Sequence, residues 1–106
     1  MREFGLDEIA LGTCALDLKD GGDGWVSSRE ILVIARRFLR DERTLSGAIA
    51  PSDPNFLRRN GTKNREYRVT ERGFLVAERL FGWSFWTKVR EFRSEYRMKE
   101  AVRKVS

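Results

Sequence analysis

Histidine is absent from the 106-residue sequence, and cysteine occurs once, at Cys14. A Ser/His/Asp or Cys/His nucleophile pair therefore cannot be assembled, and a zinc site would need an all-carboxylate shell, which is rare. A single cysteine forms no disulfide within the chain, as is usual in reducing compartments. There is also no glycine-rich phosphate loop. We therefore expect no enzyme activity, no metal and no cofactor.

Long hydrophobic runs are missing as well. No stretch of about 18 apolar residues is present, so no membrane span is expected, and the start, MREFGLDEIA, lacks the apolar core of a signal peptide. These absences predict a cytoplasmic protein. Apolar residues make up 41% of the chain and charged residues 35%, which indicates one modest core with a charged surface. No set of polar residues marks a small-molecule site.

The charge is distributed unevenly along the chain, whose net charge is +5. Residues 1–28 hold two cations against six carboxylates, whereas residues 58–72 hold six cations against two. Residues 83–106 hold seven cations against three carboxylates. A basic surface on one side is typical of proteins that bind a polyanion. The alternative is a solvated charged surface that binds no partner.

The first half of the chain has a helical pattern. Leu6–Leu18 has apolar residues at helical spacing and acids in its first turn. After a glycine-rich loop, Trp25 and Val26 form a short extended segment. Ser27 and Glu30 then match a capping box, with Ser27 as the N-cap, and predict a second helix that runs to about Asp41.

A short third helix is predicted over Thr44–Ala50, because Pro51 cannot continue it. Phe56–Arg59 fits a strand or, with a different cap, a short helix, and the strand is favoured since it can pair with the next extended segment. The turn pair Asn60-Gly61 and the alternating segment Glu66–Thr70 predict a β-hairpin.

Two helices complete the chain. Thr70 caps a helix over Glu71–Phe81, which Gly82 closes. Gly73 in its first turn lowers helix propensity, which indicates a close backbone approach at that point. The segment Trp83–Val105 forms the last helix.

The last helix carries an apolar stripe with a spacing near 3.5 residues. This stripe packs either on its own domain or against a second copy, and as a homodimer interface it comprises Phe85, Val89, Phe92 and Tyr96. The expected fold is mainly α with a small β-hairpin. Residues 1–82 form the body, and residues 83–106 add a C-terminal helix to the same domain.

The run Tyr67-Arg68-Val69-Thr70-Glu71-Arg72-Gly73 resembles the end of the wing in winged helix-turn-helix proteins of the MarR and PadR type. The segment Trp25–Ile31 is similar to the start of the second helix in that superfamily. The resemblance covers about Leu6 to Phe81. It implies a double-stranded DNA-binding domain, as in a small transcription regulator. Here Pro51 makes the third helix shorter than in the family.

The resemblance also implies which side chains meet the duplex. Residues of the third helix would reach base edges, while cations of the hairpin would meet phosphates or enter the minor groove. The first set is Arg43, Thr44 and Ser46, and the second is Arg58, Arg59, Lys63, Arg65 and Arg68. The competing interpretation is structural: Thr44 and Ser46 would only be helix caps, and Arg58 and Arg59 would only form a solvated strand face.

Other functions stay open. A protein-interaction module, or adaptor, without nucleic acid is favoured by the aromatic cluster Phe81, Trp83, Phe85, Trp86 and Phe92. RNA is a further polyanion, because aromatic and cationic residues alternate in the last helix.

A calcium loop over Asp23–Glu30 matches only the second half of an EF-hand. Lys19 and Gly21 occupy the first and third ligand positions, where oxygen ligands are needed. The glycine-rich turn and the capping box explain the same residues.

Overall fold

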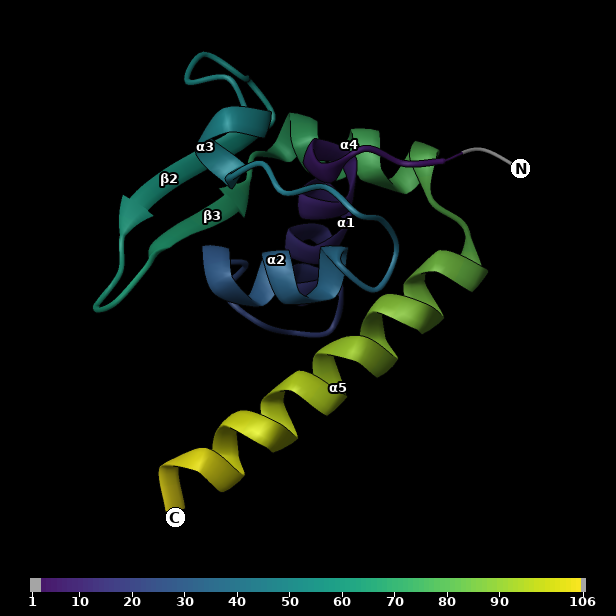
Figure 1. Cartoon of the computed structure of the whole chain (residues 1–106). Coiled ribbons are helices and arrows are strands. Elements are labelled where there is room, and N and C mark those ends of the chain that lie inside the picture. Colours follow the sequence, from purple (N-terminus) through teal and green to yellow (C-terminus); the bar gives the residue numbers. More distant parts are fainter. Residues whose placement is uncertain (1–2, 106) are drawn as a thin grey trace.

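The computed structural model describes residues 3–105, which form a mainly helical structure with a small antiparallel sheet (Figure 1). The elements, in chain order, are α1 (Leu6–Lys19), β1 (Val26–Ser27), α2 (Ser28–Ala35), α3 (Leu45–Ala48), β2 (Phe56–Asn60), β3 (Arg65–Val69), α4 (Glu71–Leu80) and α5 (Trp83–Val105). Each helix and strand expected from the sequence is present, with differences at several boundaries.

The sheet has the order β1-β3-β2, so β3 lies in the middle. The strand predicted at 56–59 is confirmed and extends to Asn60, with Phe56 opposite Val69 and Asn60 opposite Arg65. The short segment before α2 adds a third strand, because Val26 pairs with Tyr67. Side chains alternate between the two faces of a strand, and Val26, Phe56, Tyr67 and Val69 are the buried ones.

Helix α1 lies at the centre of the molecule and contacts α2, α3, α4, α5 and the sheet (Figure 1). Most of its residues are buried, as expected for a helix with no charged side chain between Ile9 and Leu16. Gly12 makes room for the first turn of α5, since a Cβ atom there would lie 2.5 Å from the Phe85 ring. Helix α5 crosses below the body, and its C-terminal half extends away from it (Figure 1).

Helix α2 ends at Ala35, so the prediction that it reaches Asp41 is wrong. The hydrogen bonds tighten there: the amide of Phe38 donates to the carbonyl oxygen of Ala35, three residues earlier, at 2.9 Å. The turn brings the Phe38 ring against Phe85 and Phe92, with centroid distances of 5.5 and 5.3 Å. Packing of this aromatic side chain on α5 thus accompanies the early end of the helix.

The predicted third helix is present, but α3 is a single turn of four residues. Thr44 is its N-cap, and Ile49 is already extended, with φ −109° and ψ 113°. The helix therefore ends before Pro51 could break it.

The start of α4 agrees with the prediction, and its end does not. Thr70 caps the helix, and a Cβ atom on Gly73 would lie 2.3 Å from the carbonyl oxygen of Asn55, which confirms the close approach. Phe81 is the extended C-cap, and Gly82 does not have a positive φ. Gly82 instead precedes α5, where its carbonyl oxygen accepts the amide of Trp86 at 3.2 Å.

No helix among residues 3–105 combines the length and the apolar character that a membrane span requires.

Candidate nucleic-acid interface

The hairpin between β2 and β3 is closed by a four-residue loop, Gly61 to Asn64. The amide of Gly61 donates to the carbonyl oxygen of Asn64 at 2.9 Å. Neither Asn60 nor Gly61 has a positive φ, so the two-residue turn that Asn-Gly pairs favour is not used. Gly61 is required for space instead, because a Cβ atom would lie 2.5 Å from the Asn64 carbonyl oxygen.

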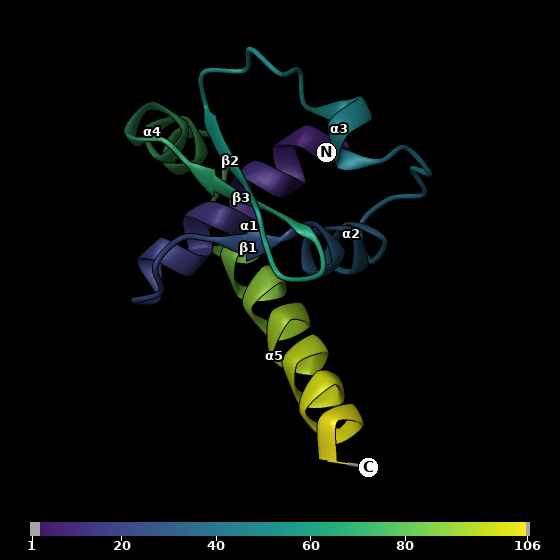
Figure 2. The same ribbon diagram turned by 90° about the vertical axis from the view of Figure 1, so that its left-hand side faces the viewer.

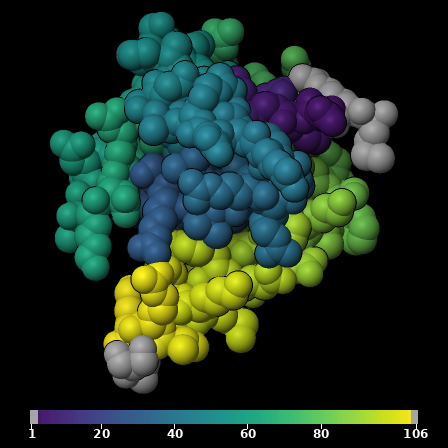
Figure 3. Space-filling view, viewed as in Figure 1, coloured from purple at the N-terminus to yellow at the C-terminus, as the bar shows by residue number. Residues whose placement is uncertain are grey.

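Two cations of the hairpin are exposed and unpaired. Within the described residues, the side chains of Lys63 and Arg65 have no hydrogen bond, ion pair or ring contact. The end of the hairpin stands out at the left of the molecule as a ridge separate from α2 and α5 (Figure 3). After a turn of the view by 90°, the hairpin faces the reader in front of α1 (Figure 2). Both charges are therefore presented to solvent on a projecting element.

The other three hairpin arginines are held by the protein. Arg58 donates to the carbonyl oxygens of Pro51, at 3.0 Å, and of Ala50, and so satisfies the end of the α3 segment. Arg59 pairs with Glu66 at 2.6 Å and lies 4.2 Å from the centroid of the Trp25 ring.

Arg68 donates to the carbonyl oxygen of Asp23 at 2.9 Å and ties β3 to the glycine-rich loop. All three arginines therefore have partners within the protein, and Arg58 and Arg59 do more than form a solvated strand face.

The residues expected to reach base edges have local partners. Arg43 makes a two-pronged ion pair with Asp41, with the shortest distance 2.7 Å, and these hydrogen bonds lower the pKa of the Asp41 carboxyl group. The Thr44 hydroxyl accepts the amide of Gly47 at 3.1 Å as the helix cap. The Ser46 hydroxyl lies 3.1 Å from that of Thr44. Each of these three side chains is therefore engaged within the protein.

Charge is nevertheless concentrated in this part of the chain. Residues 36–70, from the end of α2 to the end of β3, contain nine cations and four carboxylates. Their excess of five positive charges equals the net charge of the whole chain, +5. Arg36 and Arg40 add two exposed guanidinium groups, unpaired within the described residues, to those of the hairpin.

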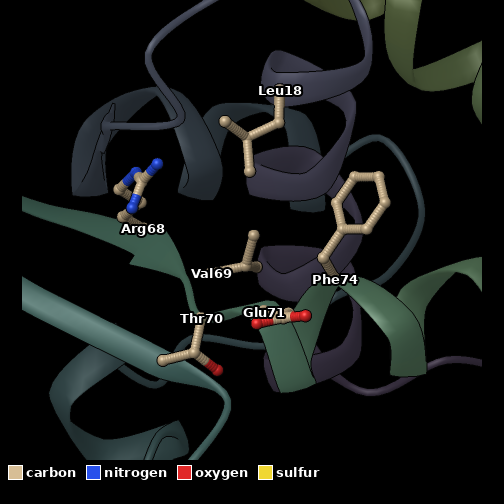
Figure 4. Close-up of a pocket in the computed structure, with 6 residues that line it drawn as sticks. All are labelled: Leu18, Arg68, Val69, Thr70, Glu71 and Phe74. Carbon is tan, nitrogen blue, oxygen red and sulfur yellow. The ribbon is translucent and has the colours of Figure 1, made fainter.

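A small cavity of about 390 Å³ lies where β3 runs into α4 (Figure 4). Leu18, Val69 and Phe74 are its apolar lining residues, and Arg68, Thr70 and Glu71 are its polar ones. One cation and one carboxylate balance each other, and Arg68 already donates to the backbone. This site therefore shows no preference for a charged ligand.

A buried ion cluster that was not expected from the sequence joins three helices. Arg93 of α5 donates to Glu30 of α2 at 2.6 Å and to Asp17 of α1 at 2.8 Å, and all three side chains are buried. Burial lowers the pKa of Arg93, but the two carboxylates more than offset this and the pKa is raised. In the sequence, only the position of Arg93 indicates that it is buried. It follows Phe85 and Val89 at steps of four residues and therefore lies on the apolar face of α5.

The stripe expected to form a dimer interface packs largely on its own chain. Phe85 and Val89 are buried in the core. Phe92 is half-buried, with its ring against Phe38 and with the guanidinium of Arg37 4.2 Å from its centroid. Tyr96 is also half-buried. Of the two arrangements left open by the sequence, packing on the domain accounts for Phe85 and Val89.

Carboxylates near the candidate calcium loop have protein partners. Asp17 accepts the amide of Gly24 at 2.8 Å, Asp20 pairs with Arg90 at 2.9 Å, and Asp23 accepts the amide of Trp25 at 2.9 Å. Among residues 3–105, no group of three or more acidic or cysteine side chains is arranged to hold a metal ion.

No family model, curated protein or solved structure matches this chain. The functional assignment therefore depends on geometry and charge.

Proposed function

We propose that the chain is a winged helix-turn-helix domain that binds double-stranded DNA through its β2–β3 hairpin, in the role of a small transcription regulator. The observation that carries this proposal is the pair Lys63 and Arg65, exposed without partners among the described residues at the end of a projecting hairpin. Unpaired cations on a projecting element are well placed to replace the counterions of a phosphate backbone.

The order of elements supports the fold in this proposal. A helix, a short strand, two helices and a hairpin follow one another, and the sheet order is β1-β3-β2. In this arrangement the hairpin is the wing and α3 is the helix that would face the major groove. The run from Tyr67 to Gly73 spans the end of β3 and the start of α4, where the proposed wing would join the next helix.

The partners of the α3 residues favour contact with phosphates over reading of bases. Bases are read by side chains that have free donors or acceptors at the groove. Arg43, Thr44 and Ser46 are each engaged locally, and α3 has a single turn. We therefore propose duplex binding with little sequence preference and a strong dependence on salt.

The test is fluorescence anisotropy of a labelled random-sequence duplex, titrated with protein across a salt series. Log affinity should fall with log salt by about 0.9 for each phosphate neutralised. The double variant Lys63→Gln/Arg65→Gln should weaken binding and reduce that slope by about 1.8. The matched control is Arg79→Gln/Lys99→Gln, which removes the same charge from exposed positions outside the hairpin.

Two results would contradict the proposal. One is an absence of binding at about 50 mM salt, where non-specific affinity is strong. The other is a control variant that weakens binding as much as the hairpin variant, which would mean that only net charge matters. Stronger binding to single-stranded RNA than to the duplex would assign the polyanion to RNA instead.

A protein-interaction module is the second candidate, and the exposure of Trp83 favours it. Of the five aromatic residues in the cluster, Phe81, Phe85 and Trp86 are buried, whereas Trp83 is 80% exposed. Trp is enriched among residues that dominate the energetics of interfaces. Replacing Trp83 by Ala should abolish self-association, measured by light scattering, and leave duplex affinity unchanged if this surface binds a second copy. If the wild-type protein is monomeric in solution, self-association does not explain why Trp83 is exposed.

A further inference from the structure

A second and larger cavity lies between segments that are far apart in the sequence. It has a volume of about 710 Å³ and lies between the segment before α1, the connection from α2 to α3 and the first turns of α5. Five apolar side chains line it: Phe4, Ile9, Phe38, Leu39 and Phe85. Its volume falls within the range of about 300–1,000 Å³ that is typical of small-ligand sites.

The aromatic walls of this cavity are held in place by further ring contacts. Phe85 stacks on Phe81 with a centroid distance of 3.7 Å. Phe38 packs edge-on against Phe92 at 5.3 Å. Because Phe81 and Phe92 are not among the residues that line the cavity, these contacts need not be broken for a ligand to enter. A preformed apolar cavity lowers the cost of ordering the site on binding.

The polar residues of the cavity carry an excess of positive charge. Arg40 and Lys88 contribute two cations, against the single carboxylate of Glu3. Within the described residues, neither Arg40 nor Lys88 has an ion pair or hydrogen bond. Arg40 comes from the connection after α2 and Lys88 from α5, so two different elements supply the cations.

We propose that this cavity binds a single-chain amphipathic carboxylate. The hydrocarbon chain would lie among the phenylalanine and leucine side chains, and the carboxylate would meet Arg40 and Lys88. Apolar burial supplies the affinity, while the two cations select an anionic head group over a neutral or positive one. This site is separate from the hairpin and does not depend on the proposed binding of DNA.

The probe for the test is decanoate, kept below its micelle concentration and titrated into the full chain by calorimetry. Decanol and decylamine are matched controls, since they keep the chain and change only the charge of the head group. Trp86 gives a second signal, because its ring lies 5.6 Å from that of Phe85 in the cavity wall. Decanoate should bind with higher affinity than either control and alter tryptophan fluorescence.

Two variants distinguish the contribution of the two cations from that of the cavity volume. Arg40→Gln/Lys88→Gln should weaken decanoate by about 2- to 30-fold, as expected for two exposed ion pairs, and leave decanol unchanged. Ser84→Trp should block the cavity, since Ser84 is an exposed residue that lines it. Ser94→Trp is its control: it adds the same side chain to an exposed serine of α5 outside the cavity lining.

The outcomes are distinct. Selective binding of decanoate that is lost in Ser84→Trp and kept in Ser94→Trp supports the site. Equal binding of all three probes would overturn the choice of a carboxylate. Absence of decanoate binding, or binding that persists in Ser84→Trp, would overturn the proposal itself.

Discussion

Replacing Arg93 by Met should destabilise the fold by about 3–5 kcal/mol, the range observed when one partner of a buried ion pair is removed. The guanidinium lies between Asp17 and Glu30, and the side-chain exposures of the three groups are 8%, 8% and 9% for Arg93, Asp17 and Glu30. Methionine fills much of the space but leaves two buried carboxylates without a buried cation. Their mutual repulsion and desolvation are the source of the loss.

The surroundings place the expected loss near the lower end of that range, at about 3 kcal/mol. Arg97 lies 3.5 Å from Asp17 and 3.6 Å from Glu30, and it supplies a partly solvated positive charge after the change. The amide of Gly24 continues to donate to Asp17 at 2.8 Å. Both interactions soften the penalty without replacing the hydrogen bonds of Arg93.

The assay is urea unfolding followed by circular dichroism, with Arg90→Met as the control. Arg90 lies on the same helix and pairs with Asp20, but its side chain is 51% exposed, so its loss should lower the stability far less than the loss of Arg93.

The reasoning fails if Arg93→Met loses no more stability than Arg90→Met.

Three further predictions concern single sites. Gly73→Ala should lower the free energy of unfolding, measured in urea melts, by about 1–3 kcal/mol, because the added Cβ would lie 2.3 Å from the Asn55 carbonyl oxygen. This loss is expected although alanine has the better helix propensity. Unchanged stability would contradict the close approach. Cys14 is fully buried, and burial raises the pKa of its thiol. Mass spectrometry should therefore show alkylation of Cys14 at neutral pH only after the protein is unfolded. Rapid labelling of the native protein would be incompatible with this burial. The hydrogen bond from Arg90 lowers the pKa of the Asp20 carboxyl, so this pair stabilises the fold at neutral pH and its contribution fades as the pH falls below about 4. Asp20→Asn should therefore differ from wild type at pH 7 and match it at low pH, and a gap that persists in acid would refute the linkage.

Local signals predicted most of the elements. The Ser27 and Thr70 caps mark the true starts of α2 and α4, because a capping side chain and the amide it satisfies are only three residues apart. The hairpin was also predicted, although its loop holds four residues and Gly61 serves to avoid a clash. Element ends were predicted less well: α2 ends at Ala35 and α4 at Leu80, where aromatic side chains turn toward α5.

The candidate interface was predicted only in part. The number of cations can be read from the sequence, but which of them form ion pairs or hydrogen bonds cannot. Within the part of the chain that the structure describes, Lys63 and Arg65 are exposed without partners, whereas Arg58 and Arg68 donate to carbonyl oxygens of other segments. The larger cavity was not predicted at all, since its walls come from three separate parts of the chain.

By itself the sequence determined the helices and strands, the absence of histidine chemistry and the concentration of positive charge in the second half. These properties depend on composition and on residues a few positions apart. The tertiary structure decided which cations are free, which face of α5 is buried and that Arg93 meets Glu30 and Asp17, residues 63 and 76 positions away. Such pairings arise only when packed helices bring distant side chains together, and no local spacing in the chain encodes them.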